Sequence, residues 1–196
     1  MISGILLSAG LSSRFGSPKA LAKLNEGTVI EHLQKRILSA GVFEIVIVLG
    51  ANAQEIKPYL LKHEQIKIVY NKDYNLGQTS SFKAGLKEIS PGAAGFMLWP
   101  VDYPLIKTET ADQLRSYFLK NKPEILIPAF NGQRGHPPVF HARLKDEFLK
   151  LADSVGINTV AHARSNNVVE LPVDDEFILR SFNTREEFDA LKKFLQ

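Results

Sequence analysis

The stretch ISGILLSAGLSSRFGSPK, residues 2–19, combines an apolar run with a loop of small residues. The run Ile2–Ser8 is typical of a buried strand. Residues 9–19 are rich in glycine and serine and carry two cations, Arg14 and Lys19. The loop is neither a Walker A loop nor a G-x-G-x-x-G turn, but small residues let backbone N–H groups approach anionic oxygens. We therefore expect a polyphosphate site; the alternative is a connecting loop with solvated charges.

The rest of the chain repeats this order of strand, loop and helix. The expected further strands are Glu44–Leu49, Ile66–Tyr70, Gly95–Pro100, Glu124–Pro128 and Val168–Val173, and the expected helices are Thr28–Ala40, Asn52–Lys62, Thr79–Ile89, Lys107–Lys120 and Thr184–Leu195. This alternation predicts an α/β fold in one domain over residues 1–196: a single doubly wound, mostly parallel (mixed) sheet with helices on both faces, Rossmann-like. Residues 131–140, with two glycines and two prolines, interrupt the pattern as an excursion.

Ligands of such sheets bind at the carboxyl ends of the strands. This rule brings three loops together, namely Ala9–Lys19, Gly77–Ser81 and Val101–Leu105. Asp102 follows an apolar strand and lies on a loop stiffened by prolines on both sides. Mg²⁺ favours one or two carboxylates together with nucleotide phosphates, so this aspartate is a candidate metal ligand. The alternative is an aspartate that only forms a turn.

Composition narrows the class of protein. The 196 residues are 44% hydrophobic and 23% charged, as in an ordinary globular protein. The absence of cysteine excludes disulfides, thiolate metal sites and a cysteine nucleophile. No signal peptide is recognisable and the apolar runs are about half of the ~20 residues that a membrane span needs, so we expect a soluble, cytoplasmic protein without a membrane partner. A net charge of +3 with scattered basic residues favours anionic small molecules over nucleic acid.

Five segments carry a family resemblance. Residues 7–19 match the pattern L-A-A-G-x-S-x-R-M-G-x-x-K, with Ser8 in place of the first alanine and Phe15 in place of the methionine. The further segments, in order, are residues 19–30, 77–86, 99–105 and 135–140. Together they resemble the MobA/MocA-like nucleotidyltransferases, the molybdenum cofactor cytidylyltransferase and guanylyltransferase type of NTP transferase domain, over nearly the whole chain.

The resemblance implies a nucleotidyltransferase fold and reaction. An acceptor phosphate oxygen attacks the α-phosphorus of an NTP and pyrophosphate leaves; the phosphate is already largely ionised at neutral pH, so no general base is needed. By resemblance Arg14, Lys19 and Asp102 are the catalytic residues, the first two on the triphosphate with Lys19 nearest the α-phosphate. Backbone amides around Ala9 and Gly10 help to hold the nucleotide, and Asp102 binds Mg²⁺.

The chain departs from the family at one expected metal ligand. Relatives end with Asp-apolar-Asp-Thr-Pro-Glu-Asp, whose second aspartate supplies that ligand, whereas this chain reads Ser-Phe-Asn-Thr-Arg-Glu-Glu over residues 181–187. Asn183 keeps an oxygen donor but loses a charge. We therefore expect weaker Mg²⁺ binding with retained chemistry. The alternative is that Asn183 caps the last helix.

Other polar residues receive narrower expectations. Gly77 is expected to contact the nucleotide. Ser80 and Ser81 are expected near its base or ribose; the alternative for the two serines is plain N-capping of a helix. His136 lies in the segment that resembles the acceptor side of the family site, and we expect it to contact the acceptor. The pair Asp174–Asp175 is expected to form a hairpin turn.

The substrates are inferred from the same comparison of motifs. Ala9 matches the form that is typical of cytidylyltransferase members. Its β-carbon narrows the base pocket, which favours binding of a pyrimidine over a purine by about 1–3 kcal/mol. We therefore expect CTP over GTP as donor and molybdopterin as acceptor, with a client molybdoenzyme receiving the product. The alternatives are transfer to a sugar or alcohol phosphate, and a nucleotide-binding regulator without turnover.

Overall fold

Strand β1 (Ile2–Ser8) lies inside the sheet, and all seven of its residues are buried. It pairs in parallel with β4 (Glu44–Leu49) on one side and with β6 (Gly95–Pro100) on the other. Isoleucine, leucine and valine on both faces suit strands that are covered by helices above and below. The structure confirms these three strands at their predicted bounds.

The computed structural model describes residues 1–25 and 27–195; Glu26 and Gln196, which fall within the predicted domain, lie outside the described residues. The other strands are β2 (Lys23–Leu24), β3 (Gly27–Thr28), β5 (Ile66–Tyr70), β7 (Ile125–Phe130), β8 (Gln133–Arg134), β9 (Val139–His141) and β10 (Val168–Pro172). The α-helices are α1 (Val29–Ser39), α2 (Ala53–Ile56), α3 (Gln78–Glu88), α4 (Thr108–Asn121), α5 (Lys145–Lys150), α6 (Asn158–Ala163) and α7 (Arg185–Lys192). None of the helices in these ranges is long and apolar enough to span a membrane.

The main sheet has the strand order β10-β7-β9-β6-β1-β4-β5, with β8 paired to β7. Strand β9 is antiparallel to both of its neighbours, β6 and β7, while β1, β4, β5 and β6 are parallel. The chain first builds outward from β1 to β4 and β5, and then returns to place β6 on the other side of β1. Such a reversal opens a crevice at the carboxyl ends of the strands. The structure thus confirms the predicted mixed, mostly parallel α/β sheet.

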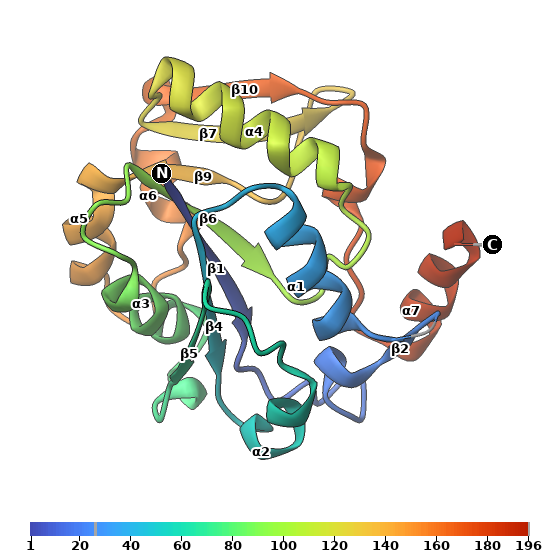
Figure 1. Cartoon of the computed structure of the whole chain (residues 1–196). Coiled ribbons are helices and arrows are strands. Elements are labelled where there is room, and N and C mark those ends of the chain that lie inside the picture. The colour runs from blue at the N-terminus through green and yellow to red at the C-terminus, as the bar shows by residue number, and fades with distance from the viewer. Residues whose placement is uncertain (26, 196) are drawn as a thin grey trace.

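Helices cover both faces of this sheet (Figure 1). Helices α1 and α4 pack on one face, where Leu33 and Leu114 are fully buried in the same apolar cluster. Helices α3 and α5 pack on the other face through Phe82 and Phe148, whose ring centroids are 5.2 Å apart. The sheet is therefore held rigidly from both sides, and its carboxyl edge provides a fixed platform for loops.

Two sequence-based predictions of helices and loops need correction. The helix predicted over residues 52–62 is α-helical only over α2 (Ala53–Ile56), and a 3₁₀ turn follows over Lys57–Tyr59. Pro58 lies in that turn; it has no N–H group to donate and disfavours an α-helix that continues through it. The excursion over 131–140 contains β8 and β9, so part of it returns into the sheet.

The predicted hairpin turn at Asp174–Asp175 is wrong. Residue 175 starts a 3₁₀ turn over Glu176–Leu179 rather than a second strand. The carboxylate of Asp175 is buried and accepts hydrogen bonds from the backbone N–H of Lys107 at 2.9 Å and from the hydroxyl of Thr110 at 2.8 Å. The aspartate therefore serves a long-range contact that local turn chemistry does not indicate.

Candidate active site

Two cavities open at the carboxyl edge of the sheet. The first cavity has a volume of about 400 Å³ and lies between the loop after β1 and the loop after β6. The second cavity has a volume of about 450 Å³ and is lined by the end of β6, residues 134–136 and the start of α6. Gln78, Pro100 and Asp102 line both cavities. Ligands bound in the two cavities would therefore meet beside Asp102.

Aromatic packing fixes the loop that follows β1. The ring of Phe15 packs edge-on against Phe182 and Phe188, with centroid distances of 5.3 and 5.8 Å. Ser12 has a positive φ of 55°, and its hydroxyl accepts a hydrogen bond from the backbone N–H of Lys19 at 3.2 Å. The loop therefore folds back on itself at a fixed position, and its two cations are held at the first cavity.

Four of the predicted site residues gather at the first cavity: Arg14, Lys19, Asp102 and Asn183. The ammonium group of Lys19 lies 3.6 Å from the carboxylate of Asp102. The amide oxygen of Asn183 accepts hydrogen bonds from Lys19 and from Arg14, each at 2.9 Å. The structure thus brings together residues from the first loop, the loop after β6 and the segment before α7.

The charges of this cluster are partly desolvated. Burial lowers the pKa of Lys19 below its ordinary value, and the attraction of Asp102 opposes this shift. Burial also raises the pKa of Asp102, against the attraction of Lys19 and Arg14. Desolvation always disfavours the charged form. A polyanion beside the cations and a cation beside the carboxylate would offset both shifts, which is what a metal-bound nucleotide supplies.

The side chain of Asn183 does not cap the last helix. Helix α7 has Thr184 as its N-cap residue, in a capping box with Glu187. Thr184 and Glu187 therefore satisfy the first turn, and the amide of Asn183 is left to contact Arg14 and Lys19. The capping alternative is wrong.

The oxygen donors at the first cavity fit a hard divalent cation whose remaining ligands are phosphates and water. In residues 1–25 and 27–195 no three His, Asp or Glu side chains gather as a metal site. The cavity instead offers the carboxylate of Asp102 and the amide oxygen of Asn183. Mg²⁺ is commonly held by one or two such oxygens and completes its shell with phosphates and water. The donor set therefore suits a cation that arrives with a polyphosphate, not one in an all-protein cage.

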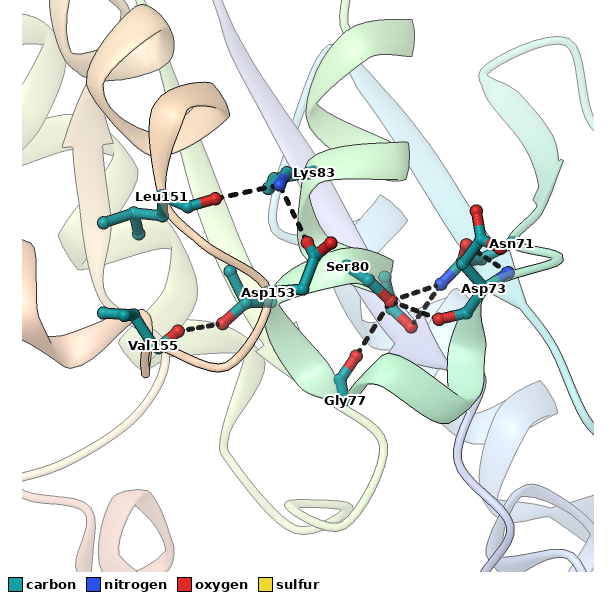
Figure 2. Close-up of polar contacts among 10 residues, drawn as sticks. Asn71, Asp73, Gly77, Ser80, Lys83, Leu151, Asp153 and Val155 are labelled. Carbon is teal, nitrogen blue, oxygen red and sulfur yellow. Dashed lines mark hydrogen bonds and ion pairs between the residues drawn. The ribbon is translucent and has the colours of Figure 1, made fainter.

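The first turn of α3 contributes the predicted residues near residue 80. Gly77 has a φ of 111°, a conformation that glycine adopts without steric cost. Gly77 and Ser81 line the first cavity. The hydroxyl of Ser80 is instead engaged within the protein: it donates to the carbonyl of Asp73 at 2.7 Å and accepts from the amide of Asn71 at 2.9 Å (Figure 2). The N-cap of α3 is Gly77, so the alternative that the serines cap this helix is wrong.

Ala9 and Gly10 also line the first cavity. The backbone carbonyl of Ala9 accepts a hydrogen bond from the N–H of Ala51 at 3.2 Å. A β-carbon built on the neighbouring Gly50 would lie 2.5 Å from that carbonyl oxygen. The close approach of these two loops therefore fixes the position of Ala9 beside the cavity.

The second cavity combines an apolar floor with a polar rim. Apolar lining residues are Leu98, Ile127, Phe140, Ile157 and Ala161. His136 lies on the rim with its ring 4.5 Å from that of Tyr103, and its Nδ1 has no hydrogen-bond partner among the described residues. Burial lowers the pKa of His136 to about 4, so the ring is neutral near pH 7.

Sequence reasoning missed most of the second cavity. Gln78, Tyr103, Arg134 and Asn158 line it but were not among the predicted site residues. Tyr103 and Arg134 adjoin predicted positions, so proximity to Asp102 and His136 could have indicated them. Nothing in the local sequence around Asn158 points to a cavity.

A mostly parallel sheet with cations and a carboxylate at its strand ends, next to a second cavity, is the arrangement expected of a Rossmann-like nucleotidyltransferase. The family model of the MobA-like NTP transferase domain matches residues 4–168, and the chain belongs to this family. It is a nucleotidyltransferase of the MobA-like type, as the sequence predicted.

Two curated relatives and one solved structure are similar to this chain over most of its length. A probable molybdenum cofactor guanylyltransferase of Bacillus thuringiensis (strain Al Hakam) is 28% identical over 200 residues, which cover 98% of this chain and 96% of the relative. A nicotine blue oxidoreductase of Paenarthrobacter nicotinovorans is 32% identical over 156 residues, 74% of this chain and 72% of the relative. The Mycobacterium tuberculosis protein Rv0371c in complex with manganese has the same fold, with a TM-score of 0.81 at 22% identity and coverage of 98% of this chain and 97% of that one.

Proposed function

We propose that the chain transfers cytidine monophosphate from CTP to the phosphate of a molybdopterin-type acceptor, with Mg²⁺, and releases pyrophosphate. The observation that carries the proposal is the meeting of two cavities at Asp102, with the cations Arg14 and Lys19 on the side of the first cavity. One cavity thus suits a polyphosphate, and the other suits a second substrate. A cytoplasmic location and delivery of the product to a client molybdoenzyme belong to the same proposal.

In the first cavity the protein binds and orients the donor. Arg14 and Lys19 exchange their hydrogen bonds to Asn183 for bonds to phosphate oxygens, with Lys19 at the α-phosphate. Backbone amides around Ala9 and Gly10 approach the remaining oxygens. As an acceptor oxygen bonds to the α-phosphorus, the bond to pyrophosphate breaks, and the two side chains balance the charge on the transferring and leaving groups. No proton transfer is needed.

Asp102 and the amide oxygen of Asn183 are the residues that would hold the Mg²⁺ ion. Bound there with the nucleotide, the ion supplies further neutralisation of phosphate charge. The manganese complex of a protein with the same fold supports a divalent cation in general. The preference for Mg²⁺ rests on the hard oxygen donors of the cavity.

Support for the two substrates differs. Ala9, which lines the first cavity, narrows the space for the base, and we expect this to favour the smaller pyrimidine by about 1–3 kcal/mol. The Bacillus relatives are named guanylyltransferases, so GTP is the competing donor. The apolar floor of the second cavity, with His136 at its rim, suits a flat heterocyclic acceptor better than a polyhydroxylated sugar phosphate.

The test is release of pyrophosphate in a panel of CTP, GTP, ATP and UTP, each with Mg²⁺ and with or without molybdopterin. We expect turnover only when molybdopterin is present, and fastest with CTP. Faster turnover with GTP would overturn the donor assignment. Turnover with a sugar or alcohol phosphate would overturn the acceptor assignment, and nucleotide binding without turnover with any acceptor would identify a regulator.

A further inference from the structure

The segment that joins α5 to α6, residues 151–157, is tied to one face of α3 (Figure 2). The ammonium group of Lys83 donates to the carbonyl of Leu151 at 2.9 Å and pairs with the carboxylate of Asp153 at 2.8 Å. The hydroxyl of Thr79 donates to the carbonyl of Val155 at 2.6 Å. We call these three contacts the α3 brace.

Helix geometry explains why two residues of α3 can hold one loop. Thr79 and Lys83 are four positions apart and therefore lie on the same helix face, one above the other. Thr79 is 3% exposed and the side chain of Lys83 is 18% exposed, so both act where water competes little. The loop carbonyls that they bind belong to a segment without its own ladder of backbone hydrogen bonds.

The brace joins elements that line the two cavities. Gly77 and Ser81 of the α3 region line the first cavity, and Gln78 lines both. The braced segment ends with Gly156 and Ile157, which line the second cavity together with Asn158 at the start of α6. The region of α3 thus contributes to the walls of both cavities. Because the brace holds the loop 151–157 against α3, it also sets the distance between this loop and Asp102.

We propose that Lys83 is a positioning residue for the substrate of the second cavity, acting through Asp153 and the loop 151–157. It contacts neither substrate. The proposal rests on the proposed function in one respect only, that the second cavity receives the acceptor. Loss of the Lys83 contacts releases the loop, widens the range of acceptor positions and leaves the first cavity intact, because Arg14 and Lys19 are held by other elements.

The test compares Lys83→Met with the matched control Lys87→Met. Lys87 lies on the same helix one turn further on, is exposed, and makes no hydrogen bond to the loop among the described contacts. In Lys83→Met we expect KM for molybdopterin to rise about tenfold, with an unchanged Kd for CTP measured by direct titration. Asp153→Asn, which keeps the bond to Leu151, is expected to show a smaller rise. Wild-type values in Lys87→Met support the proposal; equal rises in both lysine variants would overturn it.

A readout that does not need turnover separates this inference from the proposed function. Hydrogen–deuterium exchange should speed up over residues 152–158 in Lys83→Met and not in Lys87→Met, while exchange over the loop 9–19 stays as in the wild type. Unchanged exchange over 152–158 would overturn the brace whatever the activity. If exchange rises there but the wild type shows no transfer, the proposed function fails and the brace stands. A parallel rise in KM for molybdopterin and in Kd for CTP would contradict the positioning role.

Discussion

The two edges of the sheet hold buried polar clusters of opposite character. At the amino edge, Glu44 accepts hydrogen bonds from the hydroxyl of Ser3 at 2.6 Å and from the backbone N–H of Ser90 at 2.6 Å, and it pairs with Lys67 at 2.7 Å. Burial alone would raise the pKa of Glu44, but these partners lower it to about 2. At the carboxyl edge, burial prevails and the pKa of Asp102 rises. A carboxylate with all its partners in place is structural, whereas one that lacks them is ready for a ligand.

The largest effect should come from the carboxyl edge. Asp102→Ala removes the only carboxylate that lines the first cavity among the described residues, and we expect turnover to fall at least about a hundredfold. Stability should change little, because the raised pKa of Asp102 means that its ionised form does not stabilise the fold. Pyrophosphate release and urea unfolding measure the two quantities. Asp112→Ala, at an exposed pair on α4, is the control. Turnover at the wild-type rate in Asp102→Ala would refute the site.

The amino edge should respond in the opposite way. Glu44→Gln removes the charge that Lys67 and both serines satisfy, and we expect the free energy of unfolding to fall by about 1–3 kcal/mol. Nucleotide affinity should stay at the wild-type value, since the cluster lies at the other end of β1 and β4. Urea unfolding and CTP titration test this pair of expectations. If Glu44→Gln lost nucleotide binding without losing stability, the conclusion that the Glu44 cluster is structural would be wrong.

The pH dependence of stability sharpens the same contrast. The folded-state pKa of Glu44, about 2, lies below the ordinary value of 4.5. Its carboxylate therefore stabilises the fold fully above about pH 4.5, and this contribution is lost as the pH falls toward 2. Unfolding curves recorded between pH 6 and 2.5 should show a steeper decline for the wild type than for Glu44→Gln. Parallel declines would mean that Glu44 is not the group responsible.

The smallest expected effect is at Asn183. Restoring the carboxylate with Asn183→Asp adds a charged oxygen beside Asp102, and we expect the half-saturating Mg²⁺ concentration to fall several-fold. Titration of Mg²⁺ against turnover measures it, with Asn121→Asp on α4 as a control for added charge. An unchanged metal requirement would show that residue 183 serves Arg14 and Lys19 and not the metal.

The elements that could be predicted from the sequence are those with a strong local pattern of apolar residues. Strands such as β1 and β4 are continuous apolar runs between loops, so their bounds were predicted correctly. Helices α5 and α6 have six residues each, too few to show a helical period, and they were not predicted. Asp102 and Lys19 could be identified as candidates because motif and strand end coincide. The wall of the second cavity could not, since Gln78 and Asn158 line it from segments that are far apart in the sequence.

The packing of Phe15 on Phe182 and Phe188 has a consequence for the order in which the protein matures during synthesis. The cations of the first cavity are synthesised long before the rings that fix their loop and the amide that receives them. A nascent chain that ends before Phe182 therefore holds a loosely fixed phosphate loop. A chain cut before Phe182 should therefore hold Arg14 and Lys19 less firmly than a chain that includes residues 182–188.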